Sequence, residues 1–416
     1  MSRSRAPSRW AGLGLGMIAI AVLHWGLVQA RPAGQPAPAG PPAASPPAPG
    51  MTAASDARLR LLDLFPSAGG PVSHGPAPRG LSGVGVEDCA PCHAEIAAEW
   101  ASSAHARSWT DVIFQAEYKL TPEPFCRRCH APLVQEPAGE DSASRARADT
   151  LARRGIDCAV CHVRGGRVLG VRGRGDSDHA AASDARLATS AFCGSCHQFN
   201  FPAPEPGRRP RYHPGRPLQN TLREWEQSRH SDKPCQACHM PRTAGERSSA
   251  DRPRAHRDHA FRTFEDRAFM ASAVTVKASA RRRGDKIEVT VTVMPGAIGH
   301  AFPTGDMFRE AVLTIRLGDQ QHTELLRRDF ALTITDDARG HLLGEVEDTR
   351  VPARAARPWR RRVVFAAPAG AAPQPTAVDW SLELHRLPLD DARERGLPES
   401  LVRVPVSSGT ARLPGR

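Results

Sequence analysis

Aromatic residues and lysine are scarce in this sequence. Aromatic side chains make up 5% of its 416 residues, and four lysines accompany 52 arginines. So few large apolar side chains leave only a thin conventional core for the region that carries the motifs described below. Beyond residue 28 no apolar run approaches the length needed to span a bilayer, so we expect the remainder of the chain to be soluble.

Cysteine is missing from every position outside one kind of motif. All ten cysteines fall within five Cys-x-x-Cys-His pentapeptides. The motif residues are Cys89, Cys92 and His93, Cys126, Cys129 and His130, Cys158, Cys161 and His162, Cys193, Cys196 and His197, and Cys235, Cys238 and His239. This pentapeptide is the attachment signature of c-type haem: both thiols add to the porphyrin, and the histidine binds the iron as proximal ligand. The sequence therefore predicts five covalently bound c-type haems.

Three other uses of paired cysteines fit less well. Zinc knuckles take two Cys-x-x-Cys pairs for each metal ion, which leaves one of the five pairs unused, and they need no histidine after each pair. A disulfide framework would not repeat one spacing with a histidine attached. A thioredoxin-like redox pair would occur once, beside a βαβ pattern, and the sequence shows none.

The N-terminus predicts export. A basic start is followed by an apolar run of 18 residues, Ala11–Val28, and by a small-residue cleavage site before Arg31. Because haem is attached covalently outside the cytoplasm, residues 1–30 are interpreted as a signal peptide, with an uncleaved membrane anchor as the alternative. The protein is thus expected to be periplasmic or otherwise extracytoplasmic. Residues 31–81, rich in proline, alanine and glycine, predict a semi-rigid linker.

The positive charge of the chain has an explanation other than an anionic partner. A formal net charge of +12 would ordinarily indicate nucleic acid or an anionic membrane as a partner. Five haems, however, bring about ten propionate charges, which offset most of the excess. We therefore predict redox partner proteins and no nucleic acid, with membrane association only through the N-terminal segment.

Residues 82–268 are predicted to form a pentahaem domain of short helices and loops. The motifs begin 32 to 42 residues apart, so the haems must lie close together. The pattern Glu-Trp-x-x-Ser-x-His occurs twice and ends at His105 and at His230. His93 and His105 would lie about 18 Å apart on one straight helix, so they cannot bind the same iron. His105 is expected to serve a neighbouring haem.

Further histidines are candidates for the second axial position of an iron. His179 lies between the third and fourth motifs, and His259 follows the fifth, with His256 as its rival. His213 and His74 are weaker candidates, interpreted as exposed loop residues.

Residues 270–416 contain no cysteine and predict a different architecture. Polar and apolar residues alternate in 286–293, 313–317 and 378–384, as in half-buried strands, and more weakly in 272–278, 328–334 and 361–366. Short strands joined by turns predict an antiparallel β-sandwich of immunoglobulin-like type. The whole chain is thus expected to be an α + β multidomain protein.

One loop of this domain carries a histidine suited to a haem. His300 lies between a glycine and a Pro-Thr-Gly bend, where it can reach out of the sandwich. By contrast, we expect His322, His341 and His385 to be surface residues.

These residues resemble a known family, the multihaem c-type cytochromes of the cytochrome c-554 family. The likeness rests on the Cys89–His105 unit, on Thr221–His230 leading into CQACHMP, on Gly-Ile-Asp-CAVCH, on Phe-CGSCH-Gln-Phe, and on the Gly-His-x-x-Pro-Thr-Gly loop. It covers roughly residues 85–350. The resemblance implies electron transfer and bis-histidine haems. It also implies the distal ligands His105, His179, His230, His259 and His300. The family's small carrier has four motifs, and the β-domain is not part of it.

Electron transfer is therefore the predicted function, and the protein is not expected to be a catalyst. The alternative is a multihaem oxidoreductase that acts on a small nitrogen or sulfur compound at a five-coordinate haem. Related nitrite reductases often mark such a haem with Cys-x-x-Cys-Lys, and this sequence has none.

Overall fold

The computed structural model describes most of the chain from residue 74 onward. The described residues are 74–120, 122–133, 141–172, 179, 181–200, 216–245, 255–334, 341–354, 358–368 and 375–414. The predicted signal segment and nearly all of the linker lie outside these ranges. Among the described helices, none combines the length and the apolarity that a bilayer-spanning segment needs.

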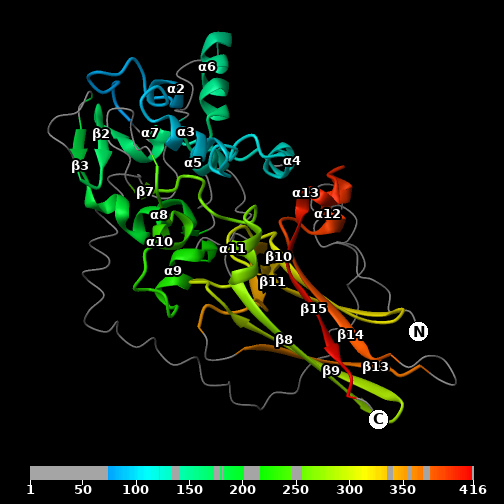
Figure 1. Cartoon of the computed structure of the whole chain (residues 1–416). Coiled ribbons are helices and arrows are strands. Elements are labelled where there is room, and N and C mark those ends of the chain that lie inside the picture. Colours follow the sequence, from blue (N-terminus) through cyan, green and yellow to red (C-terminus); the bar gives the residue numbers. More distant parts are fainter. Residues whose placement is uncertain are drawn as a thin grey trace, which may run out of the picture.

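The region with the five motifs consists of short helices and small sheets (Figure 1). Its helices are α2 (Val86–Cys89), α3 (Ala94–Ala101), α4 (Val112–Leu120), α5 (Pro124–His130), α6 (Ser142–Arg153), α7 (Cys158–His162), α8 (Ser190–His197), α9 (Thr221–Glu226), α10 (Cys235–His239) and α11 (Arg267–Ala273), with a 3-10 turn at Ala185–Ala188. Its strands are β1 (Val163–Arg164), β2 (Arg167–Gly170), β3 (Ala181–Ser183), β4 (Gln198–Asn200), β5 (Pro217–Asn220), β6 (Arg242–Thr243) and β7 (His256–Arg257).

Local capping starts several of these helices. Asp141, Thr189 and Asp266 precede α6, α8 and α11, and each side chain accepts a hydrogen bond from the backbone N–H three residues later. Such a cap satisfies one of the N–H groups that the first turn of a helix leaves unpaired. The helices therefore begin where the sequence supplies an oxygen-bearing side chain.

The C-terminal part is a β-domain built from two antiparallel sheets. Its strands are β8 (Val274–Arg283), β9 (Lys286–Pro295), β10 (Glu310–Leu317), β11 (Gln320–Ile334), β12 (His341–Asp348), β13 (Trp359–Ala366), β14 (Ala377–His385) and β15 (Arg403–Arg412). The five-stranded sheet has the order β12-β11-β10-β14-β15, and the three-stranded sheet has the order β13-β9-β8. Helices α12 (Leu389–Glu394) and α13 (Glu399–Val402) connect β14 to β15.

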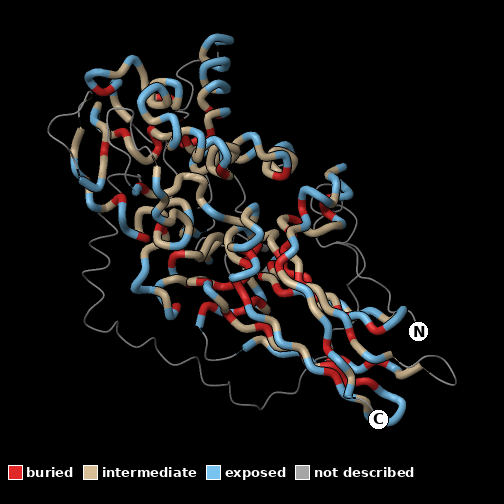
Figure 2. Tube along the Cα trace, viewed as in Figure 1, coloured by how far each residue is buried: buried red, intermediate tan, exposed pale blue. Residues whose placement is uncertain are grey.

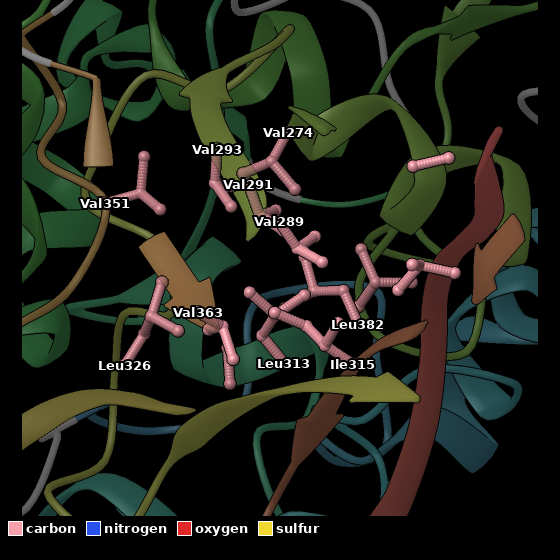
Figure 3. Packing of buried hydrophobic residues seen from close by; sticks show 14 of the residues in the cluster. Val274, Val289, Val291, Val293, Leu313, Ile315, Leu326, Val351, Val363 and Leu382 are labelled. Atoms are coloured by element: carbon pink, nitrogen blue, oxygen red, sulfur yellow. The ribbon is translucent and has the colours of Figure 1, made fainter. Parts of the chain in front are cut away.

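The two sheets share one apolar core, and Figure 3 shows its residues pointing toward one another. Val289, Val291 and Val293 of β9 alternate inward and are fully buried. They pack in the same cluster as Leu313 of β10 and Leu382 of β14, from the facing sheet. This is a β-sandwich, so the predicted α + β multidomain fold class is confirmed.

Buried residues are distributed unevenly along the chain (Figure 2). The sandwich cluster extends from Met270 to Ala411, whereas clusters in the motif region hold two to four buried residues each, such as that of Leu133, Ala159, Val160 and Val163. The described part of the motif region therefore lacks a continuous protein core of its own.

The surface placement expected for one histidine is wrong. His385 at the end of β14 is 3% exposed, and its ring lies 3.4 Å from the carboxylate of Glu310 and 3.5 Å from that of Glu383. The two carboxylates supply polar partners for the buried ring, and no pattern in the sequence predicts this burial.

Truncating Leu313 to alanine is expected to lower the free energy of unfolding of the β-domain by about 2–5 kcal/mol, because the side chain is fully buried and leaves a cavity. Leu325→Ala is the matched control, since this leucine is 39% exposed and its loss should cost about 0.5 kcal/mol or less. Urea titrations that monitor the fluorescence of Trp359 and Trp380 compare the two variants. Equal destabilisation would contradict the assignment of the core.

Candidate haem sites

Each of the five motifs lies on or beside a short helix. Four of these helices, α5, α7, α8 and α10, end at the motif histidine. In the first motif α2 ends at Cys89, and the N–H of His93 donates to the carbonyl of Cys89 at 3.0 Å, so the same helical turn is present. One helical turn places the first cysteine and the histidine on a single face, as attachment to one porphyrin requires. None of the ten cysteines forms a disulfide, and Cys92 and Cys238 are exposed.

Thiol contacts show which motifs are neighbours in space. Cys89 of the first motif is hydrogen-bonded to Cys158 of the third. The fourth motif contacts two others, through Cys129 with Cys196 and through Cys193 with Cys235. The fourth motif is therefore flanked by the second and the fifth.

Four motif histidines each face a second histidine from a distant part of the chain. The ring centroids are 6.5 Å apart for His93 and His179, 6.4 Å for His197 and His105, 6.2 Å for His162 and His259, and 6.2 Å for His239 and His300. The partners are four of the five residues that the sequence predicted as distal ligands.

This spacing is the one that two imidazoles on one iron would need. A metal–imidazole bond is about 2 Å long and the ring centre lies roughly 1 Å beyond the nitrogen, so two axial rings have centres about 6 Å apart. Rings stacked in direct contact lie closer together, as the 3.8 Å between the centroids of His130 and Phe114 shows. The four pairs therefore leave room for a metal between them.

Backbone carbonyls fix the outer nitrogen of several of these rings. Nδ1 lies 2.7–3.0 Å from a carbonyl oxygen in five histidines, and because a carbonyl only accepts, Nδ1 is the donor. The pairs are His130 with Ser108, His162 with Leu169, His239 with Arg262, His259 with Arg257, and His300 with Ala301. The proton on Nδ1 leaves the lone pair on Nε2, the atom that would bind iron. No sequence signal could have identified these partners, since each is a main-chain atom.

Burial lowers the pKa of several of the facing rings. It lowers the pKa of His105 to about 3, and those of His197, His259 and His300 to about 4, with neighbouring histidines or other nearby charges adding to the effect in each. Only a neutral imidazole can donate a lone pair to a metal. The electrostatics of the site thus suit ligation near neutral pH.

The second motif differs from the other four. The ring of His130 stacks on Phe114 of α4, with centroids 3.8 Å apart and an angle of 10°. Among the described residues no histidine faces His130 across a metal-sized gap. His213, one of the weaker candidates, lies outside the described residues.

The structure does not bring His230 to a motif histidine. This residue is half-buried, and its Nε2 accepts a hydrogen bond from Arg229 at 3.2 Å. His74, the other weak candidate, has its Nδ1 beside the carbonyl of Gly75.

The motif region fits haem in a second respect. Among its described residues the apolar clusters hold two to four buried side chains each and do not join into one continuous core. Porphyrins at these positions would supply the missing apolar surface. The residues present therefore suit c-type haem.

Comparisons with known proteins agree with this geometry. Residues 88–163 match the family model for cytochrome c554 and c-prime. The structure is similar to that of a penta-heme cytochrome c552 from Thermochromatium tepidum, with 19% sequence identity and a TM-score of 0.55, over 80% of this chain and 100% of that one. No curated protein matches the sequence.

The structural match reaches beyond the motif region. Residues 1–268 are less than two thirds of the chain, so a match over 80% of it includes part of the β-domain. The chain thus has the fold of a multihaem c-type cytochrome, with a β-domain attached to its haem-binding region.

Proposed function

We propose that this protein is an exported electron carrier that holds five covalently attached c-type haems. Each pair of motif cysteines binds one porphyrin, and the motif histidine supplies the proximal nitrogen. When bound, haem iron supplies reversible one-electron chemistry. The observation that carries the proposal is the set of four histidine pairs with centroids 6.2–6.5 Å apart.

The distal nitrogens come from His179, His105, His259 and His300, which serve the first, fourth, third and fifth motifs. A second histidine on the iron favours low-spin electron transfer over binding of a substrate, since it leaves no open position. Four such pairs support a carrier more strongly than an oxidoreductase acting on a small nitrogen or sulfur compound.

The contacts between motifs support one continuous route. The first motif touches the third through Cys89 and Cys158, and the fourth touches the second and the fifth. Burial chiefly raises the pKa of Cys161 to about 12, and the nearby charge of Cys196 in the fourth motif adds to this rise. The motifs therefore follow the spatial order first, third, fourth and fifth, with the second beside the fourth.

Location and partners follow from the chemistry of attachment. Covalent haem binding requires export, so we place the protein in the periplasm or another extracytoplasmic space, where its partners are redox proteins. The N-terminal segment serves as a cleaved signal or as an anchor. The haem propionates bring the net charge of the chain close to neutral, which removes the reason to expect a nucleic acid partner.

The haem count has a direct test. The intact mass of the mature protein is expected to exceed that of the processed polypeptide by five haem masses, because all ten cysteines are used. Pyridine haemochrome absorbance per chain gives an independent count. Free thiols that react with an alkylating reagent in the denatured holoprotein, or zinc in place of iron, would contradict the proposal.

A further inference from the structure

We propose that the repeated Glu-Trp-x-x-Ser-x-His pattern is a haem clamp: within each copy, the tryptophan fixes the proximal side of one haem site and the glutamate fixes the distal side of the same site. The first clamp is residues 99–105 and the second is residues 224–230. This role of the two glutamates as positioning residues rests on the histidine pairing proposed above.

The tryptophan of each clamp holds the backbone just before a motif. The indole N–H of Trp100 donates to the carbonyl of Ile156 at 2.8 Å, and that of Trp225 donates to the carbonyl of Lys233 at 2.9 Å. Ile156 lies two residues before Cys158, and Lys233 lies two residues before Cys235. The two clamps thus grip the third and the fifth motif at the same point.

The histidine of each clamp holds the same residue from its other side. The N–H of Ile156 donates to the carbonyl of His105, and the N–H of Lys233 donates to the carbonyl of His230, both at 3.0 Å. One residue before each motif is therefore held by both its N–H and its C=O. Equivalent bonds form although the partners are 56 residues apart in one clamp and 8 in the other, and in the second clamp the indole N–H also donates to the carbonyl of His230 at 3.1 Å. The shared geometry therefore belongs to the pattern and not to the length of the connection.

The glutamate of the first clamp holds the distal loop of the third motif. Oε2 of Glu99 accepts a hydrogen bond from the N–H of His259 at 2.9 Å, and Oε1 lies 2.9 Å from Nε2 of His256. His259 is the residue that faces His162. The motif gripped by Trp100 and the distal histidine held by Glu99 therefore belong to one haem site.

The second clamp repeats this arrangement across the boundary with the β-domain. Oε2 of Glu224 accepts from the N–H of Ala301 at 3.2 Å and from the hydroxyl of Thr304 at 2.7 Å, while Oε1 accepts from Arg350 at 2.7 Å. Ala301 directly follows His300, which faces His239. Again the tryptophan and the glutamate serve the two sides of one site, here the fifth motif.

Close packing leaves the second distal loop little freedom. A Cβ atom added to Gly299 would lie 3.3 Å from Cδ1 of Trp225 and 3.5 Å from Cβ of His230. Glu224 and Arg350 are 8% and 9% exposed, so their bond is shielded from water. This explains the outcome for His230: its backbone completes a clamp, and the loop of the β-domain packs against it.

Removing either glutamate should loosen one distal histidine and no other. A hydrogen bond to a charged carboxylate is worth about 1.5–3 kcal/mol, so its loss is expected to raise the fraction of that site lacking its distal ligand about tenfold or more. Carbon monoxide binds ferrous haem only at an open position. Its binding to the reduced holoprotein, counted per chain, therefore measures the loosening without any assay of activity.

The experiment combines the glutamate and histidine variants in one set of pairs. Glu99→Ala and Glu224→Ala should each increase carbon monoxide binding, while exposed Glu226→Ala, on the same helix as Glu224, should leave it at the wild-type level. In a His259→Ala background, Glu99→Ala should not increase carbon monoxide binding any further. In a His300→Ala background it should increase this binding as much as it does in the wild type. Glu224→Ala should not increase carbon monoxide binding in the His300→Ala background, and should increase it fully in the His259→Ala background.

The outcomes distinguish a failure of the clamp from a failure of the histidine pairing on which it rests. If His259→Ala and His300→Ala open one haem each but the glutamate variants do not, the clamp is wrong and the histidine pairing stands. If neither histidine variant opens a haem, the pairing fails and the clamp with it. Should an alanine variant not fold, Glu99→Gln and Glu224→Gln are used. Each glutamine keeps an acceptor oxygen. Carbon monoxide binding that lies between the level of the wild type and that of the matching histidine variant supports the clamp. Binding at the level of the wild type overturns it.

Discussion

Replacing His300 with alanine is expected to convert one low-spin haem into a high-spin haem that binds carbon monoxide. The ring of His300 is buried, its centroid lies 6.2 Å from that of His239, and its Nδ1 is held by a carbonyl. Alanine leaves the iron at the fifth motif without a second nitrogen. Electronic and EPR spectra of the purified holoprotein should show the change in one haem, with the remaining low-spin haems unaffected.

His230→Ala is the matched control for this variant. The sequence gives the two histidines equal standing as candidates, but the structure brings only His300 to a motif histidine. His230→Ala should therefore keep the wild-type spin states. If His300→Ala keeps every haem low-spin, or if His230→Ala opens one, the pairing seen in the structure is not the one that holds the iron.

Loss of the third haem should have the largest effect on folding. Cys158→Ala with Cys161→Ala removes both thioether bonds from α7, which lies at the centre of the cluster of Leu133, Ala159 and Val160. Because the motif region has no continuous core, we expect this region to become sensitive to protease and to lose much of its helical circular dichroism.

The β-domain should survive this change, since its own core extends across both sheets. Limited proteolysis followed by mass spectrometry is expected to leave a resistant fragment that begins near Val274. The control is the double variant Thr275→Ala with Ser279→Ala, which changes two exposed positions on β8. In this control both the motif region and the β-domain should stay resistant to protease. A motif region that stays helical and resistant without its third haem would contradict the prediction.

The sequence predicted the strands that alternate and missed those that do not. Strands β9, β10 and β14 carry a strict alternation of polar and apolar residues, and all three were predicted close to their observed bounds. β15 was missed because Pro405 and Gly409 interrupt its pattern; pairing with β14 along its whole length, and not its own propensity, makes it a strand. β12 was missed in the same way, since its place is set by pairing with β11.

The candidate haem sites were also only partly predictable from the sequence. Motif spacing predicted the proximal residues, because thiols and imidazole are brought together within one helical turn. The pairing of distal histidines depends on contacts between segments far apart, which spacing does not encode. His105 and His230 end the same local pattern, yet only His105 faces a motif histidine, because the loop at Gly299 packs on the second copy.

If the chain is exported from its N-terminus as proposed, the histidine pairs would also set an order in which it matures. Each pair joins residues about 60 to 100 positions apart, so each site would be complete only when the later histidine of its pair has emerged. The first site can close once His179 has emerged, the fourth at His197 and the third at His259. Of the four paired sites the fifth would close last, at His300, whose loop joins two strands of the sandwich. The β-domain would thus contribute the last ligand that these four sites need.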